Sequence, residues 1–388
     1  MDFDALAARC VIVGIQGLVP TVDELELIGR GVGGVILFKR NVESPQQLAE
    51  LSRTLKAAAK APLLVSIDQE GGRVQRLRAP YWTDLPSMRR IGEIDVQGGI
   101  GGMNGVAIAE RLGRLVAQEL SACGIDHDYA PILDVDTNPN NPVIADRSFG
   151  RDPARVARLG VAFAKGLEAG SVASCAKHFP GHGDTSQDSH KVLPRLAHDR
   201  ERLWQVELVP FVAAARAGLA SVMTAHVRFE AFDRLPATLS PLSLQILRRD
   251  VGYQGACISD DLEMKAIADT YGVVDGAELA ISAGCDGGAR LPYPRAPAPG
   301  DRWHRARRQG RSASTRAAGR GGRADVEAAA VRPPLVRDPS RGGGTGLRHR
   351  GEPRIRGDAP GEHRDRGRRT PPRSDRMARR LRPGPTGG

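Results

Sequence analysis

The sequence predicts an α/β fold in which short parallel strands alternate with helices. Short apolar and β-branched runs alternate with longer segments of helical periodicity over residues 11–283, which is the pattern of repeated βα units. Polar side chains follow most of these runs, as expected where parallel strands end at an active-site face. Residues 1–288 are also numerous enough for one α/β barrel, which needs about 250 residues.

Seven segments are candidate strands, because each is a short apolar run bounded by Gly, Pro or polar residues. They are Val11–Gly17, Val32–Phe38, Pro62–Asp68, Asp128–Val135, Val172–His178, Ser221–His226 and Ala256–Asp260. Helical segments are expected between and after them, near 22–30, 45–59, 104–123, 152–169, 199–217, 240–249 and 275–283. In the segment 45–59, Leu48, Leu51 and Leu55 recur at three- and four-residue spacing, as on the buried face of a helix.

These seven βα units predict a (β/α)₈ barrel of the TIM type whose eighth strand and final helices are missing or replaced by a disordered tail. In a parallel barrel the carboxyl ends of the strands converge on one face, where active sites are built. We therefore expect a pocket formed by the polar residues at these ends, which are Asp68, Asp134, Lys177-His178, His226 and Asp260.

Residues 289–388 differ in composition from the rest of the chain. They contain 26 Arg, no Lys and nine acidic residues, whereas residues 1–288 contain 30 basic and 36 acidic residues. A segment so rich in Arg, Gly and Pro buries too little apolar surface to offset the entropy of ordering it. We therefore predict a catalytic domain over residues 1–287 and a disordered tail over 288–388.

Two origins of the tail are open. A high-GC gene read in a shifted frame from about Asp286–Ala289 would give this composition, and a genuine Arg-rich tail would bind nucleic acid. In either case we expect no eighth strand between the seventh and the first. Two exposed parallel edges would remain, so we expect the chain to have poor stability or no activity.

The sequence disfavours a membrane-spanning protein and a secreted one. No apolar run approaches the ~20 residues needed to span a bilayer, and the acidic start lacks the pattern of a secretory signal. The five cysteines are widely spaced in apolar stretches, which is typical of buried thiols in a reducing compartment. We expect a cytoplasmic protein that does not bind membranes and whose body does not bind nucleic acid.

The segment 177–190 contains three His and two Asp among Gly and Pro residues. A metal site is one interpretation, and a cradle for sugar hydroxyls is another. Within this segment, residues two apart on an extended loop point the same way. The Asp188 carboxylate can therefore bond the His190 ring and raise its basicity.

Two adjacent acids end the apolar run at 256–260. Successive strand residues face opposite sides, so we expect one of Asp260 and Asp261 to enter the pocket and the other to cap the next helix. A carboxylate at a strand end is a candidate covalent nucleophile.

Four motifs together resemble family 3 glycoside hydrolases, specifically their single-domain bacterial β-N-acetylglucosaminidases of peptidoglycan recycling. The motifs are Lys177-His178-Phe179-Pro180-Gly181-His182-Gly183-Asp184-Thr185 with Asp188-Ser189-His190, Asp68-Gln69-Glu70-Gly71-Gly72-Arg73-Val74-Gln75-Arg76, Asp146-Arg147-Ser148-Phe149-Gly150, and Ser259-Asp260-Asp261-Leu262. The resemblance extends over about residues 10–287. It implies a TIM-type barrel and a retaining hydrolase with a glycosyl-aspartate intermediate.

The resemblance also implies residue roles. Asp260 would be the nucleophile and His190, polarised by Asp188, the general acid/base. The hydroxyls of a terminal N-acetylglucosamine would be held by Asp68, Arg76, Arg147, Lys177 and His178. The resemblance further implies a monomer that acts on N-acetylglucosaminyl-anhydro-muropeptides and needs no metal or organic cofactor. A family 3 β-glucosidase-like hydrolase of another specificity is the alternative within the family.

Overall fold

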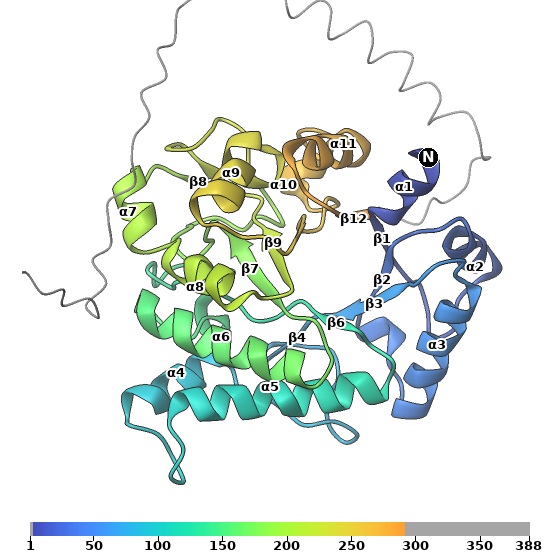
Figure 1. The fold of residues 1–388 in the computed structure, drawn as a ribbon, viewed down its shortest axis with the longest axis horizontal. Coiled ribbons are helices and arrows are strands. Elements are labelled where there is room, and N and C mark those ends of the chain that lie inside the picture. Colours follow the sequence, from blue (N-terminus) through green and yellow to red (C-terminus); the bar gives the residue numbers. More distant parts are fainter. Residues whose placement is uncertain (1–2, 292–388) are drawn as a thin grey trace, which may run out of the picture. The chain divides into compact units, whose positions relative to one another are not determined.

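The computed structural model describes residues 3–291 and confirms the α/β class (Figure 1). Two sheets contain only parallel strand pairs, in the orders β12-β1-β2-β3-β6 and β11-β9-β7. Their strands are β1 (Val11–Gly14), β2 (Gly34–Leu37), β3 (Leu64–Ile67), β6 (His127–Asp128), β7 (Cys175–Phe179), β9 (Ser221–Thr224), β11 (Ala256–Ile258) and β12 (Gly288–Leu291). Two short pairs lie outside these sheets, formed by β4 (Gln69–Gly71) with β5 (Val74–Gln75) and by β8 (Arg195–Leu196) with β10 (Arg228–Phe229).

Helices surround these strands in Figure 1. The main ones are α1 (Phe3–Arg9), α2 (Val22–Gly29), α3 (Pro45–Ala58), α4 (Met88–Val96), α5 (Gly105–Ala122), α6 (Pro153–Ala169), α7 (Arg200–Gln205), α8 (Val209–Ala217), α9 (Pro241–Gln245), α10 (Lys265–Ala268) and α11 (Val273–Ala283). Leu48, Leu51 and Leu55 of α3 are all buried, as their spacing predicts. No helix within residues 3–291 has the length and apolar character needed to cross a bilayer.

Isolated parallel bridges link the two sheets at both edges. On one side His127 pairs with Ala173, and Ile132 with Lys177, which joins the β6 region to β7. On the other side Ile258 of β11 pairs with Gly287, which immediately precedes β12. Backbone pairing therefore connects eight parallel strands in one series.

The prediction of a missing eighth strand is wrong, because β12 pairs with β1 over Gly288–Leu291. The Asp286 N–H donates to the carbonyl of Cys257 at 2.7 Å, and the Gly288 N–H donates to that of Cys10 at 3.1 Å. Residues 286–291 therefore pair with both β11 and β1, and neither strand has an exposed edge along these residues. A short parallel strand is held by backbone hydrogen bonds to its neighbours, so it can form from residues of almost any type. The Arg-rich composition of the residues after it concealed β12 in the sequence.

Glycine is required at the start of β12. Gly288 has φ +121, and a Cβ there would lie 2.5 Å from the backbone nitrogen of Ser259. The strand can therefore approach the segment that carries Asp260 only because residue 288 has no side chain.

Two other elements differ from the sequence prediction. The strand expected over 128–135 is regular only at His127–Asp128, because Pro131 has no N–H to donate to a ladder. The helix expected over 199–217 is divided into α7 and α8, because Pro210 is tolerated in the first turn of a helix but not in its interior. Gly288–Leu291, the first residues of the predicted tail, form β12. The final helices and the disorder, origin and nucleic-acid binding of the rest of the tail concern residues from 292 onward, which lie outside the described residues.

Candidate active site

A cavity of about 380 Å³ opens where the parallel strands end. Of the eight residues that the sequence points to as catalytic or sugar-binding, seven line it: Asp68, Arg76, Arg147, Lys177, His178, His190 and Asp260. The eighth, Asp188, contacts the cavity-lining His190. Side chains from β7 and from the segments after β3, β6, β7 and β11 thus meet in one place.

Asp260 and Asp261 both line the cavity, so the expectation that only one of them enters it is wrong. β11 ends at Ile258, and the alternation of a strand no longer applies beyond that residue. The Asp261 N–H donates to Asp260 Oδ1 at 2.8 Å, and Asp261 Oδ1 accepts from the Glu263 N–H at 2.9 Å. Asp261 therefore caps a turn that precedes α10, whose N-cap is Met264.

Opposing effects set the charge of Asp260. Burial raises its pKa, but the nearby histidines His226 and His178, the Asp261 N–H and the Lys177 ammonium lower it more. The net effect is a pKa below the usual range of a carboxyl, so Asp260 is a carboxylate at neutral pH. This is the ionisation state that a nucleophile requires.

Asp188 and His190 form a pair on the loop after β7. Asp188 Oδ1 lies 2.9 Å from His190 Nδ1 and also accepts the His190 N–H at 2.9 Å. Burial raises the pKa of Asp188, but the bonds and charge of His190 lower it to a net value below the usual range. The His190 side chain is 64% exposed, so Nε2 is accessible while Nδ1 is held.

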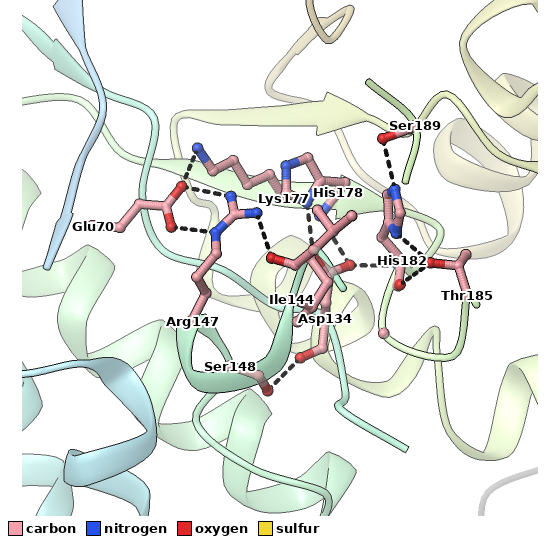
Figure 2. Close-up of polar contacts among 12 residues, drawn as sticks. Glu70, Asp134, Ile144, Arg147, Ser148, Lys177, His178, His182, Thr185 and Ser189 are labelled. Atoms are coloured by element: carbon pink, nitrogen blue, oxygen red, sulfur yellow. Dashed lines mark hydrogen bonds and ion pairs between the residues drawn. The ribbon is translucent and has the colours of Figure 1, made fainter. Parts of the chain in front are cut away.

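Two carboxylates and three cations form a cluster at one side of the cavity. Lys177 Nζ lies 2.9 Å from Asp68 Oδ1 and 2.7 Å from Glu70 Oε1. Arg147 donates to both oxygens of Glu70 at 2.8 Å, and Arg76 pairs with Asp68 at 2.9 Å (Figure 2 shows Glu70, Arg147 and Lys177). Oxygens and charged nitrogens therefore alternate, a pattern suited to sugar hydroxyls that both donate and accept.

Glu70 is a member of this cluster that was not among the candidates from sequence. Burial raises its pKa, but Arg147 and Lys177 lower it to about 2. The sequence held one signal for it, because Glu70 lies two residues after Asp68 and residues at that spacing share a face in an extended segment.

Asp134 holds the end of β7 and the segment that follows it. Its Oδ2 lies 2.7 Å from His178 Nδ1, and its Oδ1 accepts the N–H groups of His178 and His182 at 3.2 and 2.6 Å (Figure 2). Sequence reasoning placed Asp134 at a strand end but gave it no role. His226, also expected in the pocket, does not appear among the residues lining this described cavity. Its ring instead contacts the Asp261 carbonyl at 2.9 Å.

The histidines and aspartates of 177–190 separate into different contacts. His178 bonds Asp134, His190 bonds Asp188, and Asp184 lies 2.5 Å from His198 Nε2. Among residues 3–291, no three His, Cys, Asp or Glu side chains are grouped so that they could hold a metal ion. The metal interpretation of this segment is therefore not supported by the geometry of the described residues.

Residues 20–288 match the model of the glycosyl hydrolase family 3 N-terminal domain. The chain is 45% identical over 265 residues to a β-hexosaminidase of Neisseria meningitidis, covering 68% of this chain and 72% of that protein.

Two solved structures are similar. NagZ from Neisseria gonorrhoeae in complex with N-trifluoroacetyl-D-glucosamine is 40% identical, with a TM-score of 0.67, covering 73% of this chain and 81% of NagZ. A family 3 β-N-acetylglucosaminidase from Paenibacillus sp. is 41% identical, with a TM-score of 0.71; the match covers 75% of this chain but only 55% of that longer one. With the family model matched over most of residues 1–291, this chain belongs to glycoside hydrolase family 3 and is a glycoside hydrolase.

Proposed function

We propose that this chain is a retaining, exo-acting β-N-acetylglucosaminidase. The observation that carries the proposal is that one cavity is lined by the Asp260 carboxylate and the His190 ring, with Asp188 bonded to that ring. A retaining glycosidase needs a nucleophile and an acid/base at one anomeric centre. The similarity to enzymes named β-hexosaminidase and β-N-acetylglucosaminidase supports N-acetylglucosamine as the sugar.

In the first step an Asp260 oxygen attacks the anomeric carbon as the bond to the leaving oxygen breaks. His190 donates its proton to that oxygen, so the aglycone leaves as an alcohol and the sugar is esterified to Asp260. Asp188, bonded to Nδ1, keeps the ring oriented for the transfer.

In the second step a water molecule attacks the same carbon and breaks the ester. His190 accepts a proton from the water, and Asp260 leaves as a carboxylate. Two inversions at one carbon give net retention, so the first product is the β-anomer.

The charged cluster, together with His178, would bind the terminal sugar. Asp68, Arg76, Arg147, Lys177 and His178 all line the cavity, and hydrogen bonds from them, charge-assisted for the first four, would fix the ring above Asp260. A volume of about 380 Å³ is near the lower end for small-molecule sites. That size favours one terminal sugar over an internal unit of a long chain.

We also propose the barrel architecture, the natural substrate, the cellular location and the oligomeric state. The eight parallel strands would form a TIM-type (β/α)₈ barrel in a catalytic domain that extends through β12. The natural substrate would be an N-acetylglucosaminyl-anhydro-muropeptide of peptidoglycan recycling, cleaved in the cytoplasm by a monomer. The resemblance of the four motifs supports this assignment.

Chromogenic assays test the proposal. The purified chain should release 4-nitrophenol from the β-N-acetylglucosaminide and much less from the β-glucoside, and ¹H NMR should show the β-anomer first. Preference for the β-glucoside would favour the alternative specificity, and α-anomer as first product would exclude the retaining scheme.

A further inference from the structure

We propose that the hydrogen bond between Ser189 and His182 is a clamp that holds the acid/base loop, residues 186–192, at the distance from Asp260 that catalysis needs. Ser189 and His182 are then positioning residues, neither of which transfers a proton. This inference rests on the proposed roles of His190 and Asp260.

Burial distinguishes Ser189 from the rest of the acid/base loop. Ser186, Gln187, His190, Lys191 and Val192 are exposed, and Asp188 is half-buried. Ser189 is 1% exposed. The loop therefore meets the body of the protein through this one buried side chain.

Hydrogen bonds show the same arrangement. Ser189 Oγ lies 3.0 Å from His182 Nε2 (Figure 2), and the Ser189 carbonyl accepts the Ala266 N–H at 3.3 Å. Within the described part of the chain, the other hydrogen bonds of the acid/base loop, including both between Asp188 and His190, stay inside it. The Asp188–His190 pair thus orients the imidazole within the loop, and Ser189 connects the loop to other segments.

The two partners of Ser189 belong to different segments, His182 to the segment after β7 and Ala266 to α10. His182 is itself fixed, because its N–H donates to Asp134 and its Nδ1 lies 2.8 Å from Thr185 Oγ1. Ala266 lies in α10, directly after the turn that contains Asp260 and Asp261. Ser189 therefore ties the acid/base loop both to the segment after β7 and to the segment that carries the nucleophile.

The ring of His182 suits this contact. Burial lowers the pKa of His182 to about 4, so the ring is neutral at pH 7 and offers one N–H donor and one acceptor nitrogen. A hydroxyl at each nitrogen, Ser189 at Nε2 and Thr185 at Nδ1, satisfies both. Gly183, the next residue, lets this segment pack closely on the Val135 backbone, because a Cβ at Gly183 would lie 1.8 Å from the Val135 carbonyl oxygen.

The first test compares Ser189→Ala with Ser186→Ala, an exposed serine of the same loop. A displaced His190 matters most where the leaving group needs a proton. For N,N′-diacetylchitobiose, Ser189→Ala should lower kcat about 10- to 100-fold. For the 4-nitrophenyl glycoside the loss should stay within about 3-fold, and KM should change little for either substrate. Ser186→Ala should match wild type on both.

A second measurement does not depend on activity. Hydrogen–deuterium exchange of peptides covering 186–192 should be faster in Ser189→Ala than in wild type and unchanged in Ser186→Ala. His182→Gln, whose side-chain amide can donate to or accept from Ser189 Oγ in place of Nε2, should retain slow exchange and most of the chitobiose activity, whereas His182→Ala should lose both.

Equal losses on the two substrates, or unchanged exchange in Ser189→Ala, would overturn the clamp. Failure of the proposed function gives a different result, since the wild-type chain would then cleave neither substrate. In that case the exchange experiment alone still decides whether Ser189 holds the loop.

Discussion

Glu70 accepts two parallel hydrogen bonds from the guanidinium of Arg147, each at 2.8 Å. The same carboxylate lies 2.7 Å from Lys177 Nζ and is 1% exposed. One buried anion thus balances two of the cations that face the cavity and fixes the direction in which both point.

Replacing Glu70 with glutamine should weaken sugar binding. The amide keeps the shape but leaves Arg147 and Lys177 as uncompensated neighbouring cations. We expect KM for the 4-nitrophenyl glycoside to rise about 10-fold or more, with a smaller change in kcat, in steady-state assays. Glu93→Gln, which removes an exposed partner of Arg90 on α4, is the matched control, and an unaltered KM in Glu70→Gln would exclude this role.

The two adjacent aspartates should differ strongly in their contribution to turnover. Asp260→Asn removes the carboxylate proposed to attack the sugar, so kcat should fall about 10³-fold or more. Asp261→Asn keeps an Oδ1 that can accept from the Glu263 N–H, so its loss should stay within about 10-fold. The reverse order in the same assay would assign the nucleophile to Asp261.

The buried Asp128 carboxyl predicts pH-dependent stability. Burial raises the pKa of Asp128 to about 8, and an unfolded aspartate has a pKa of about 4. A raised folded pKa gives a stabilising contribution that is fully present below about pH 4 and is lost as the pH rises through 8. Above pH 8 the folded protein must carry the charge in a buried position.

Asp128→Asn should therefore be more stable than wild type at high pH. The amide oxygen can keep the bond from the Gln69 N–H, which Asp128 Oδ1 accepts at 2.9 Å, and it never becomes charged. We expect the difference in Tm between the two proteins to grow steadily from pH 4 to pH 8, because each pH unit between the two pKa values changes the stability difference by about 1.4 kcal/mol, or roughly 2–4 °C. Calorimetric scans that show a pH-independent difference would contradict the raised pKa.

The eighth strand can be tested through Gly288. Gly288→Ala adds a Cβ 2.5 Å from the Ser259 nitrogen at a position with φ +121. Gly252→Ala is the control for backbone strain alone, because Gly252 has φ +79 and no heavy atom within 4 Å of the added Cβ. Gly288→Ala should be about 1–3 kcal/mol less stable than Gly252→Ala in urea unfolding. Equal stabilities would mean that β12 does not pack against Ser259.

Much of the candidate site could be predicted from the sequence, because its residues lie at positions that local sequence patterns mark. Asp68, Lys177 and Asp260 each follow an apolar run, and parallel strands bring such ends together. The pairing of Glu70 with Arg147 connects residues 77 apart in sequence, which no local pattern records. The alternation rule misplaced Asp261, because β11 ends before it.

The composition of the C-terminal region led to a wrong prediction, because its average concealed the short strand β12. The Arg-rich residues after Leu291 dominate any window of that region, yet Gly288–Leu291 need only backbone groups to pair with β1. Close approach at Gly288 is a three-dimensional requirement, and a Gly-Gly pair in sequence predicts a turn as readily as a strand.

Covalent trapping tests the central claim most directly. A 5-fluoro derivative of N-acetylglucosaminyl fluoride combines a good leaving group with slowed hydrolysis of the glycosyl-enzyme, so the intermediate accumulates. Peptide mass mapping should then find one N-acetyl-5-fluoroglucosaminyl group on the peptide containing Asp260, and none in Asp260→Asn. A label on another residue, or turnover without any labelled peptide, would contradict the account.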